Sequence, residues 1–157
     1  MSSPIRIVHP ADADTLWVVR DRIRFMGEVP GTELAVLEVE VPPGSGTPPH
    51  LHASPELFRV LAGEISFARF AEGPPTWTVA GPGTVVTVPS GAPHGYRNDS
   101  AAPASLLVVV ERPMVGFFRD IGRKEPPPAG PPTDAEIASV LAACNRHQIT
   151  LLGGAPA

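Results

Sequence analysis

Alternation of apolar and polar residues is the dominant pattern of the chain, and a period of two predicts β-strands. The clearest case is the segment 34–41, LAVLEVEV, in which every second residue is apolar and the others include two glutamates. This pattern is typical of an antiparallel strand with one buried and one solvated face. We expect a further strand over residues 15–29, where Asp21 falls in the apolar phase and indicates a bend or bulge.

More strand patterns follow, separated by turns that are rich in glycine and proline. Residues 57–70 are expected to form a hairpin with Gly63 in its turn, because a turn favours a residue that is free to adopt positive φ. Short strands are expected over 77–79 and 84–88. Residues 105–111, SLLVVVE, are apolar in both phases, which is typical of a strand that is covered on both faces.

Two helices are expected after these strands. Residues 114–122 form a short apolar pattern, which a proline-rich linker separates from a second helix starting near residue 133. Thr133 and Glu136 form a capping-box pattern, and apolar residues then recur with helical spacing. Cys144 belongs to this apolar face, so we interpret it as a buried structural thiol.

The length of 157 residues is that of one domain with a core of its own. Many short strands joined by glycine and proline turns predict an all-β fold, a double-sheet jelly roll with a short C-terminal helical tail. We divide the chain into an N-terminal arm (1–14), a barrel (15–113) and a C-terminal helical extension (114–157). His9 in the arm and His147 after the second helix are interpreted as histidines without a ligand role.

Charge, apolar content and cysteine count indicate which partners and which cellular compartment are expected. The formal net charge of −4 disfavours nucleic acid, because phosphate binding needs a basic surface. The sequence has no long apolar run that would cross a membrane and no signal-peptide pattern. A single cysteine cannot form an internal disulfide. We therefore expect a cytoplasmic protein without a nucleic-acid or membrane partner.

The segment GSGTPPHLHASPE contains the first candidate site residues, His50, His52 and Glu56. If residues 50–58 form one strand, all three side chains lie on the same face. Two imidazoles and a carboxylate suit a divalent metal, although a polar loop with solvated histidines explains this segment equally well. A second segment, GTVVTVPSGAPHGYRN, places His94 directly after a proline- and glycine-rich turn, which favours the metal site.

Both segments resemble the two sequence motifs of the cupin family at every fixed position. The first motif, G-x5-HxH-x3-E-x6-G, and the second, G-x5-PxG-x2-H-x3-N, have the spacings found here. The ten matching residues are Gly44, His50, His52, Glu56, Gly63, Gly83, Pro89, Gly91, His94 and Asn98. The resemblance implies a cupin double-stranded β-helix barrel.

By this resemblance, His50, His52, Glu56 and His94 are the four protein ligands of one divalent transition metal. The ligand set suits Fe, Mn, Ni, Co, Cu or Zn, and it leaves open positions for a small-molecule substrate and for dioxygen. The resemblance also implies a homodimer, which forms through an edge strand or the N-terminal arm.

The sequence is similar in particular to small cupins of the quercetin 2,3-dioxygenase-like group. This similarity implies a dioxygenase that acts on a flavonol-like or other enolic or aromatic small molecule, with Glu56 as both ligand and catalytic base. Two alternatives stay open: a non-redox metal-dependent cyclase, isomerase or lyase of a natural product, and a non-catalytic cupin that binds a small ligand. The residues expected to line the substrate pocket are Phe58, Val60, Tyr96 and Phe117.

Overall fold

A computed structural model describes residues 4–152, and in it two antiparallel β-sheets face each other across a hydrophobic core. The strands are β1 (Asp14–Val18), β2 (Asp21–Glu28), β3 (Leu34–Val41), β4 (Gly46–Leu51), β5 (Glu56–Ala62), β6 (Ile65–Arg69), β7 (Thr76–Ala80), β8 (Val85–Val88), β9 (His94–Arg97), β10 (Ala104–Glu111) and β11 (Thr150–Leu151). The helices are η1 (Pro10–Asp12), α1 (Arg112–Ile121) and α2 (Asp134–Arg146). The expected all-β barrel with a C-terminal helical tail is confirmed.

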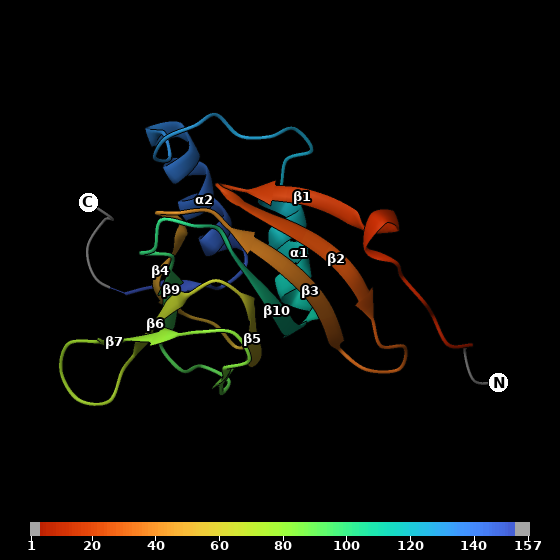
Figure 1. Cartoon of the computed structure of the whole chain (residues 1–157), viewed down its shortest axis with the longest axis horizontal. Coiled ribbons are helices and arrows are strands. Elements are labelled where there is room, and N and C mark those ends of the chain that lie inside the picture. The colour runs from red at the N-terminus through yellow and green to blue at the C-terminus, as the bar shows by residue number, and fades with distance from the viewer. Residues whose placement is uncertain (1–3, 153–157) are drawn as a thin grey trace.

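The two sheets contain strands from distant parts of the chain (Figure 1). The six-stranded sheet has the order β1-β2-β3-β10-β5-β8, and the five-stranded sheet has the order β11-β4-β9-β6-β7. Neighbours such as β10 and β3 are far apart in sequence, as a jelly roll requires. Every paired strand runs antiparallel to its neighbour.

The prediction of one strand over residues 15–29 is wrong, because the chain folds back on itself between Val18 and Asp21. β1 and β2 pair in register from Val18↔Asp21 onward. Val19 occupies the left-handed region at φ 57°, which a β-branched residue rarely adopts. No glycine, proline or asparagine marks this turn in the sequence. The bend expected at Asp21 corresponds to this turn, which ends at Asp21, whereas the bulge in β2 lies between Phe25 and Gly27.

The predicted hairpin over residues 57–70 is wrong as well. β5 pairs with β10 and β8 in one sheet, whereas β6 pairs with β7 and β9 in the other. Gly63 does have positive φ, at 75°, but it serves a corner at which the chain crosses from one sheet to the other. A side chain at Gly63 would lie 2.8 Å from Ala104, so the crossing also depends on close backbone approach.

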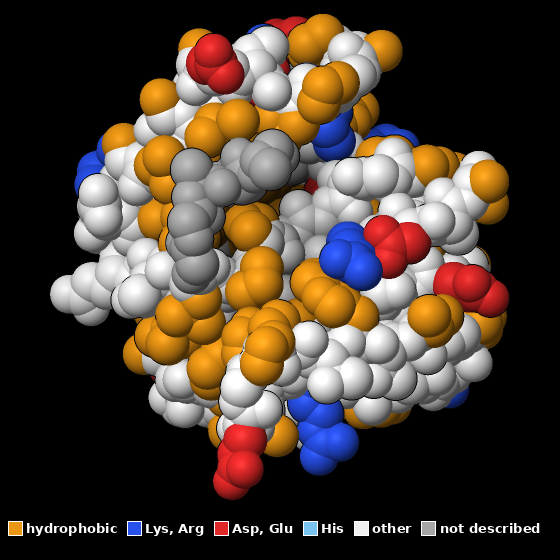
Figure 2. Space-filling view, turned by 90° about the vertical axis from the view of Figure 1, so that its left-hand side faces the viewer, with side chains coloured by type: hydrophobic (Ala, Val, Ile, Leu, Met, Phe, Trp, Pro, Cys, Tyr) orange, Lys and Arg blue, Asp and Glu red, His pale blue; other side chains and the backbone are white. Residues whose placement is uncertain are grey.

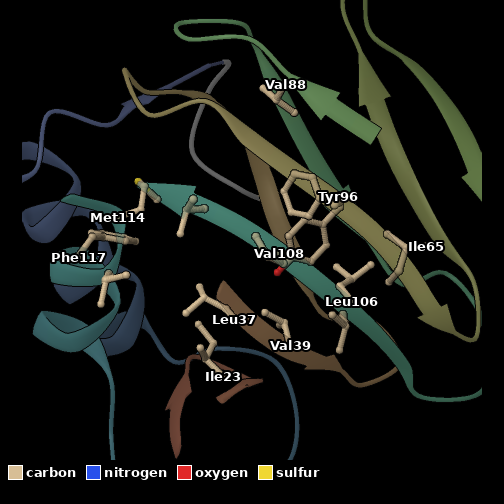
Figure 3. Packing of buried hydrophobic residues seen from close by; sticks show 14 of the residues in the cluster. Ile23, Leu37, Val39, Ile65, Val88, Tyr96, Leu106, Val108, Met114 and Phe117 are labelled. Atoms are coloured by element: carbon tan, nitrogen blue, oxygen red, sulfur yellow. The ribbon is translucent and has the colours of Figure 1, made fainter. Parts of the chain in front are cut away.

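The core lies between the sheets and continues under α1 (Figure 3). Figure 3 shows Leu37 and Leu106 from the six-stranded sheet, Ile65 from the five-stranded sheet, and Met114 and Phe117 from α1 around one interior. These side chains are at most 7% exposed. The alternation seen in the sequence therefore places one face of each of these strands in the core.

The C-terminal helix is capped as expected and leads back to the barrel. The Thr133 side chain accepts a hydrogen bond from the Glu136 backbone amide, and the reciprocal bond of the capping box is also present. Cys144 is buried, as predicted. After α2, β11 pairs with the outer edge of β4 at Leu151↔His50. Residues 153–157, the end of the predicted extension, and residues 1–3 of the arm lie outside the described residues.

The side of the molecule that carries α2 and the five-stranded sheet exposes many hydrophobic side chains between a few charged ones (Figure 2). Val79 of β7 has 63% of its surface exposed. Among residues 4–152, no helix has the length and apolar character needed to span a membrane.

Candidate metal centre

Two of the predicted ligands face each other across neighbouring strands. His50 of β4 and His94 of β9 are direct partners in the antiparallel register of the five-stranded sheet. Their ring centroids lie 4.3 Å apart. The register shifts between Thr47 and His50, where prolines 48 and 49 have no backbone donors for the ladder. The two histidines thus come together although 43 residues separate them in the sequence.

His52 and Glu56 approach the same point from a turn and from the second sheet. The expectation of one strand over residues 50–58 is wrong, because β4 ends at Leu51 and β5 begins at Glu56 in the other sheet. Residues of a distant loop hold the turn between β4 and β5 in place. The Gly91 amide donates to the His52 carbonyl, and Ser90 Oγ donates to the Ala53 carbonyl. The side chains therefore converge because two sheets meet here, and not because one strand has a period of two.

Ligand atoms of His50, His52 and His94 lie within 4.8 Å of one another, and all three residues are buried. Glu56 Oε1 lies 2.7 Å from His52 Nε2 and 3.9 Å from His94 Nε2. The structure therefore brings all four predicted ligand residues together. His9 lies exposed in the N-terminal arm, and His147 contacts Asp120 on the helical side of the molecule.

Each of the three imidazoles is held by a backbone carbonyl behind it. The Nδ1 atoms of His50, His52 and His94 lie 2.8, 2.8 and 2.9 Å from the carbonyl oxygens of Pro48, Ser54 and Ala92. A carbonyl oxygen only accepts, so each Nδ1 carries the hydrogen and each neutral ring presents its Nε2 lone pair. This backing by a second group is the usual arrangement of metal-bound histidines.

The arrangement at His52 fits a cation. Nε2 of His52 and Nε2 of His94 are buried and have no hydrogen-bond partner. The 2.7 Å distance from His52 Nε2 to Glu56 Oε1 is therefore a close approach of two acceptors without a hydrogen bond between them. Two facing acceptors repel unless a positive charge lies between them, so this donor set of three imidazoles and one carboxylate fits a divalent metal.

Burial keeps two of the histidines neutral. Burial first, and then the neighbouring His94, lower the pKa of His50 from 6.5 to about 4. Burial also lowers the pKa of His94. Neutral imidazole is the form that binds a metal, so both rings are ready to bind at neutral pH.

The four residues predicted to line a pocket are all buried, and two of them, Phe58 and Tyr96, pack against each other. Phe58 is adjacent to the metal centre, since its ring centroid is 6.5 Å from that of His94 and 5.9 Å from that of Tyr96. Val60 is part of the same core, and Phe117 pairs instead with Phe118 and His147. Their role in substrate binding stays a prediction.

Two buried residues that contact Tyr96, namely Asp21 and Phe67, were missed by the sequence analysis. Asp21 is buried and accepts hydrogen bonds from Tyr96 Oη at 2.5 Å and from Ser45 Oγ at 2.6 Å. Burial raises the pKa of Asp21 to about 6. The signal in the sequence was that Asp21 occupies a position where the alternating pattern of residues 15–29 expects an apolar residue. Phe67 also lines this region, with ring centroids 5.3 Å from Phe58 and 6.2 Å from Tyr96.

Residues 37–110 match the Cupin domain family. This match covers a little under half of the chain and, with the two sheets and the histidine cluster, shows that the barrel is similar to a cupin domain. No curated protein sequence matches the chain.

Solved structures with this fold include several enzymes. The polyketide cyclase RemF from Streptomyces resistomycificus is 26% identical, with a TM-score of 0.58 over 69% of this chain and 80% of that one. A sugar phosphate isomerase of the cupin superfamily from Silicibacter pomeroyi is 25% identical, with a TM-score of 0.51 over 60% of this chain and 61% of that one. A variant of oxalate decarboxylase from Bacillus subtilis, at 21% identity and a TM-score of 0.58, matches 71% of this chain but 30% of its own and shares the fold.

Proposed function

We propose that this protein is a metal-dependent enzyme that removes a proton from an enolic or phenolic small molecule, with Glu56 as the base. The observation that carries the proposal is the position of the Glu56 carboxylate. It faces the Nε2 atoms of His52 and His94 without accepting a hydrogen bond from either. A carboxylate in this position can serve as a ligand or accept a substrate proton.

His50, His52, His94 and Glu56 would hold the metal, which would supply Lewis-acid polarisation of a substrate oxygen. The backbone carbonyls behind the three imidazoles keep their Nε2 atoms aimed at one point. Glu56 accepts the proton of a hydroxyl held at that point. Phe58, Phe67 and Tyr96 form a packed aromatic interior beside His94, which excludes water from this side of the site.

Two reaction classes use this deprotonated substrate. In a dioxygenase of flavonol-like compounds, dioxygen then attacks the substrate. In a cyclase or isomerase, the enolate reacts without an oxidant. The similarity to the polyketide cyclase RemF supports the second class, and the resemblance of the motifs to quercetin dioxygenase-like cupins supports the first.

The test compares metal-loaded protein on a panel of flavonols and polyphenolic hydroxyenones under air and under strict anaerobiosis. Product analysis by mass spectrometry and an oxygen electrode are the readouts. Turnover that persists without oxygen identifies the non-redox class, and oxygen uptake that matches product formation identifies the dioxygenase.

Glu56→Gln is the variant that tests the base. It should lose turnover at least ~100-fold, in line with general-base catalysis, while calorimetry still detects substrate binding. Substrate binding without turnover by the unmodified, metal-loaded protein would contradict an enzyme and favour a ligand-binding cupin.

A further inference from the structure

One arginine lies in the same row of the five-stranded sheet as two of the candidate metal ligands. β9 has β4 on one side and β6 on the other (Figure 1). It pairs with β4 at His50↔His94 and with β6 at Arg69↔His94. Residues that are directly opposite each other in an antiparallel pair point to the same face of the sheet. The register therefore places Arg69 beside His94, on the face that carries the imidazoles.

The alternation along β6 gives the same orientation. Ile65 and Phe67 are 0% and 7% exposed and belong to the core between the sheets. Phe67 also packs against Tyr96 of β9. Because side chains alternate along a strand with a period of two, Arg69 follows these two residues on the inward face.

The inward face of this sheet becomes accessible to solvent at Arg69. Earlier inward residues of β6 are buried, whereas Arg69 is exposed. Thr76, its partner on the neighbouring strand β7, is exposed as well. The interior of the barrel is thus open at the level of the row that contains His50 and His94, and a ligand that enters here meets Arg69 beside the buried imidazoles.

The guanidinium of Arg69 is available to a ligand. Six other arginines form ion pairs with carboxylates. In the part of the chain that the structure describes, the Arg69 side chain has neither an ion pair nor a hydrogen bond. The planar guanidinium of an arginine binds a carboxylate through two parallel hydrogen bonds, so this position suits an anionic group of a ligand.

The spacing of the strands indicates how large the ligand is. β6 lies one strand spacing from β9 and two from β4, or ~5–10 Å. A molecule with one oxygen at the imidazoles and a carboxylate at Arg69 must span this distance. A hydroxylated benzene ring that carries a carboxylate on its far side has the required length.

We propose that Arg69 is a specificity-determining residue, which binds the carboxylate of a phenolic or enolic acid. The substrate class is then narrower than enolic or phenolic compounds in general, because it includes only those with an anionic group. This inference rests on the proposed function, since it places the substrate hydroxyl at His50, His52, His94 and Glu56. Glu56 accepts the proton at the hydroxyl end, and the positive charge of Arg69 holds the acid end.

The test is calorimetric binding of two probes of the same shape, 3,4-dihydroxybenzoate and 3,4-dihydroxybenzamide, to the zinc-loaded full-length protein. Zinc has no redox chemistry, so binding is measured without oxidation of the probes. The unmodified protein should bind the acid ~10–100-fold more tightly than the amide, which is the usual contribution of a hydrogen bond to a charged group. Arg69→Gln should remove this preference and leave the affinity for the amide unchanged. Arg69→Lys, which keeps the charge but not the planar group, should retain part of the preference.

Arg59→Gln is the matched control. Arg59 is an exposed arginine on the outward phase of β5, and its replacement changes the net charge by the same amount. This variant should keep the preference for the acid, and circular dichroism verifies that each variant is folded.

Four results would overturn the proposal: binding of neither probe, equal affinities for both in the unmodified protein, a preference that survives in Arg69→Gln, and an equal loss of preference in Arg59→Gln. The proposed function would fail by a different result, namely unchanged turnover in Glu56→Gln.

Discussion

Tyr96 of β9 donates its hydroxyl hydrogen to the buried carboxylate of Asp21 of β2 over 2.5 Å, and this bond joins the two sheets inside the barrel. Ser45 also donates to Asp21. The two hydroxyls stabilise the carboxylate only in part, because burial outweighs them and raises the pKa of Asp21 from 3.8 to about 6. Burial of the Asp21 carboxylate therefore costs stability near neutral pH, and the two hydrogen bonds offset only part of this cost.

The first prediction concerns this cost. Below pH ~3 the folded and unfolded chains both hold the Asp21 proton, so Asp21 does not make stability depend on pH there. As pH rises toward 6, the unfolded chain loses the proton first, and stability falls by about 3 kcal/mol at ~1.36 kcal/mol per pKa unit. Asp21→Asn should thus be more stable than the unmodified protein at pH 7.5, with the gain disappearing near pH 4.

Urea unfolding at a series of pH values measures this difference in the free energy of unfolding. Asp99→Asn is the control, because Asp99 forms an exposed ion pair with Arg97 and its removal should change stability by less than ~1 kcal/mol. A gain for Asp21→Asn that stays constant from pH 4 to 8 would show that ionisation of Asp21 is not its source.

The second prediction separates the ligands from the other histidines. His50→Ala, His52→Ala and His94→Ala should each reduce the bound metal to less than about a tenth, because each removes one of few ligands. His9→Ala and His147→Ala, which lie away from the cluster, should keep normal metal content. Elemental analysis of the five purified variants gives the result, and normal stoichiometry in His94→Ala would refute the ligand set.

The third prediction concerns the corner between the sheets. Gly63 and Gly73 both have positive φ, at 75° and 78°, so alanine costs each about 1–2 kcal/mol of backbone strain. Only at Gly63 does the new Cβ approach the Ala104 backbone, at 2.8 Å, while Gly73 faces open space. Gly63→Ala should therefore lower the free energy of unfolding by ~1–3 kcal/mol more than Gly73→Ala. Equal losses would mean that the close approach is relieved without cost.

The fourth prediction concerns the aromatic interior. Phe67 is 7% exposed and packs against Phe58 and Tyr96. Phe67→Ala should destabilise the fold by ~3–5 kcal/mol, because it removes a buried ring and leaves a cavity. Leu61→Ala, at a side chain that is 43% exposed, should cost less than ~1 kcal/mol. Thermal unfolding monitored by circular dichroism compares the two variants.

Much of the fold could be predicted because alternation with a period of two is a local property. The strands β3 and β10 and the capped helix α2 follow from patterns in their own residues. The turn at Val19 could not be predicted, since it uses positive φ at a residue type that disfavours it. The crossing at Gly63 was missed because a glycine with positive φ serves a hairpin and a corner equally well, and only pairing with distant strands decides between them.

The four residues of the candidate metal centre were predicted for a partly incorrect reason. The residue types and spacings identified His50, His52, Glu56 and His94, but the single strand that was meant to align three of them does not exist. For Asp21 the sequence signal was correct but its interpretation was incomplete. A charged residue at an apolar position was interpreted only as a bend or bulge, whereas Asp21 is a buried carboxylate that accepts two hydrogen bonds. A buried acid becomes recognisable only when the partners that reach it from the other sheet are known.

Glu56 belongs to the six-stranded sheet, whereas His50 and His94 belong to the five-stranded one. Separation of the sheets during unfolding therefore requires the carboxylate to move away from these imidazoles. A metal bound at this point would connect the two sheets, so its occupancy should slow unfolding and lengthen resistance to proteases, in addition to raising equilibrium stability. The same four side chains that suit the chemistry would then also set the lifetime of the folded chain.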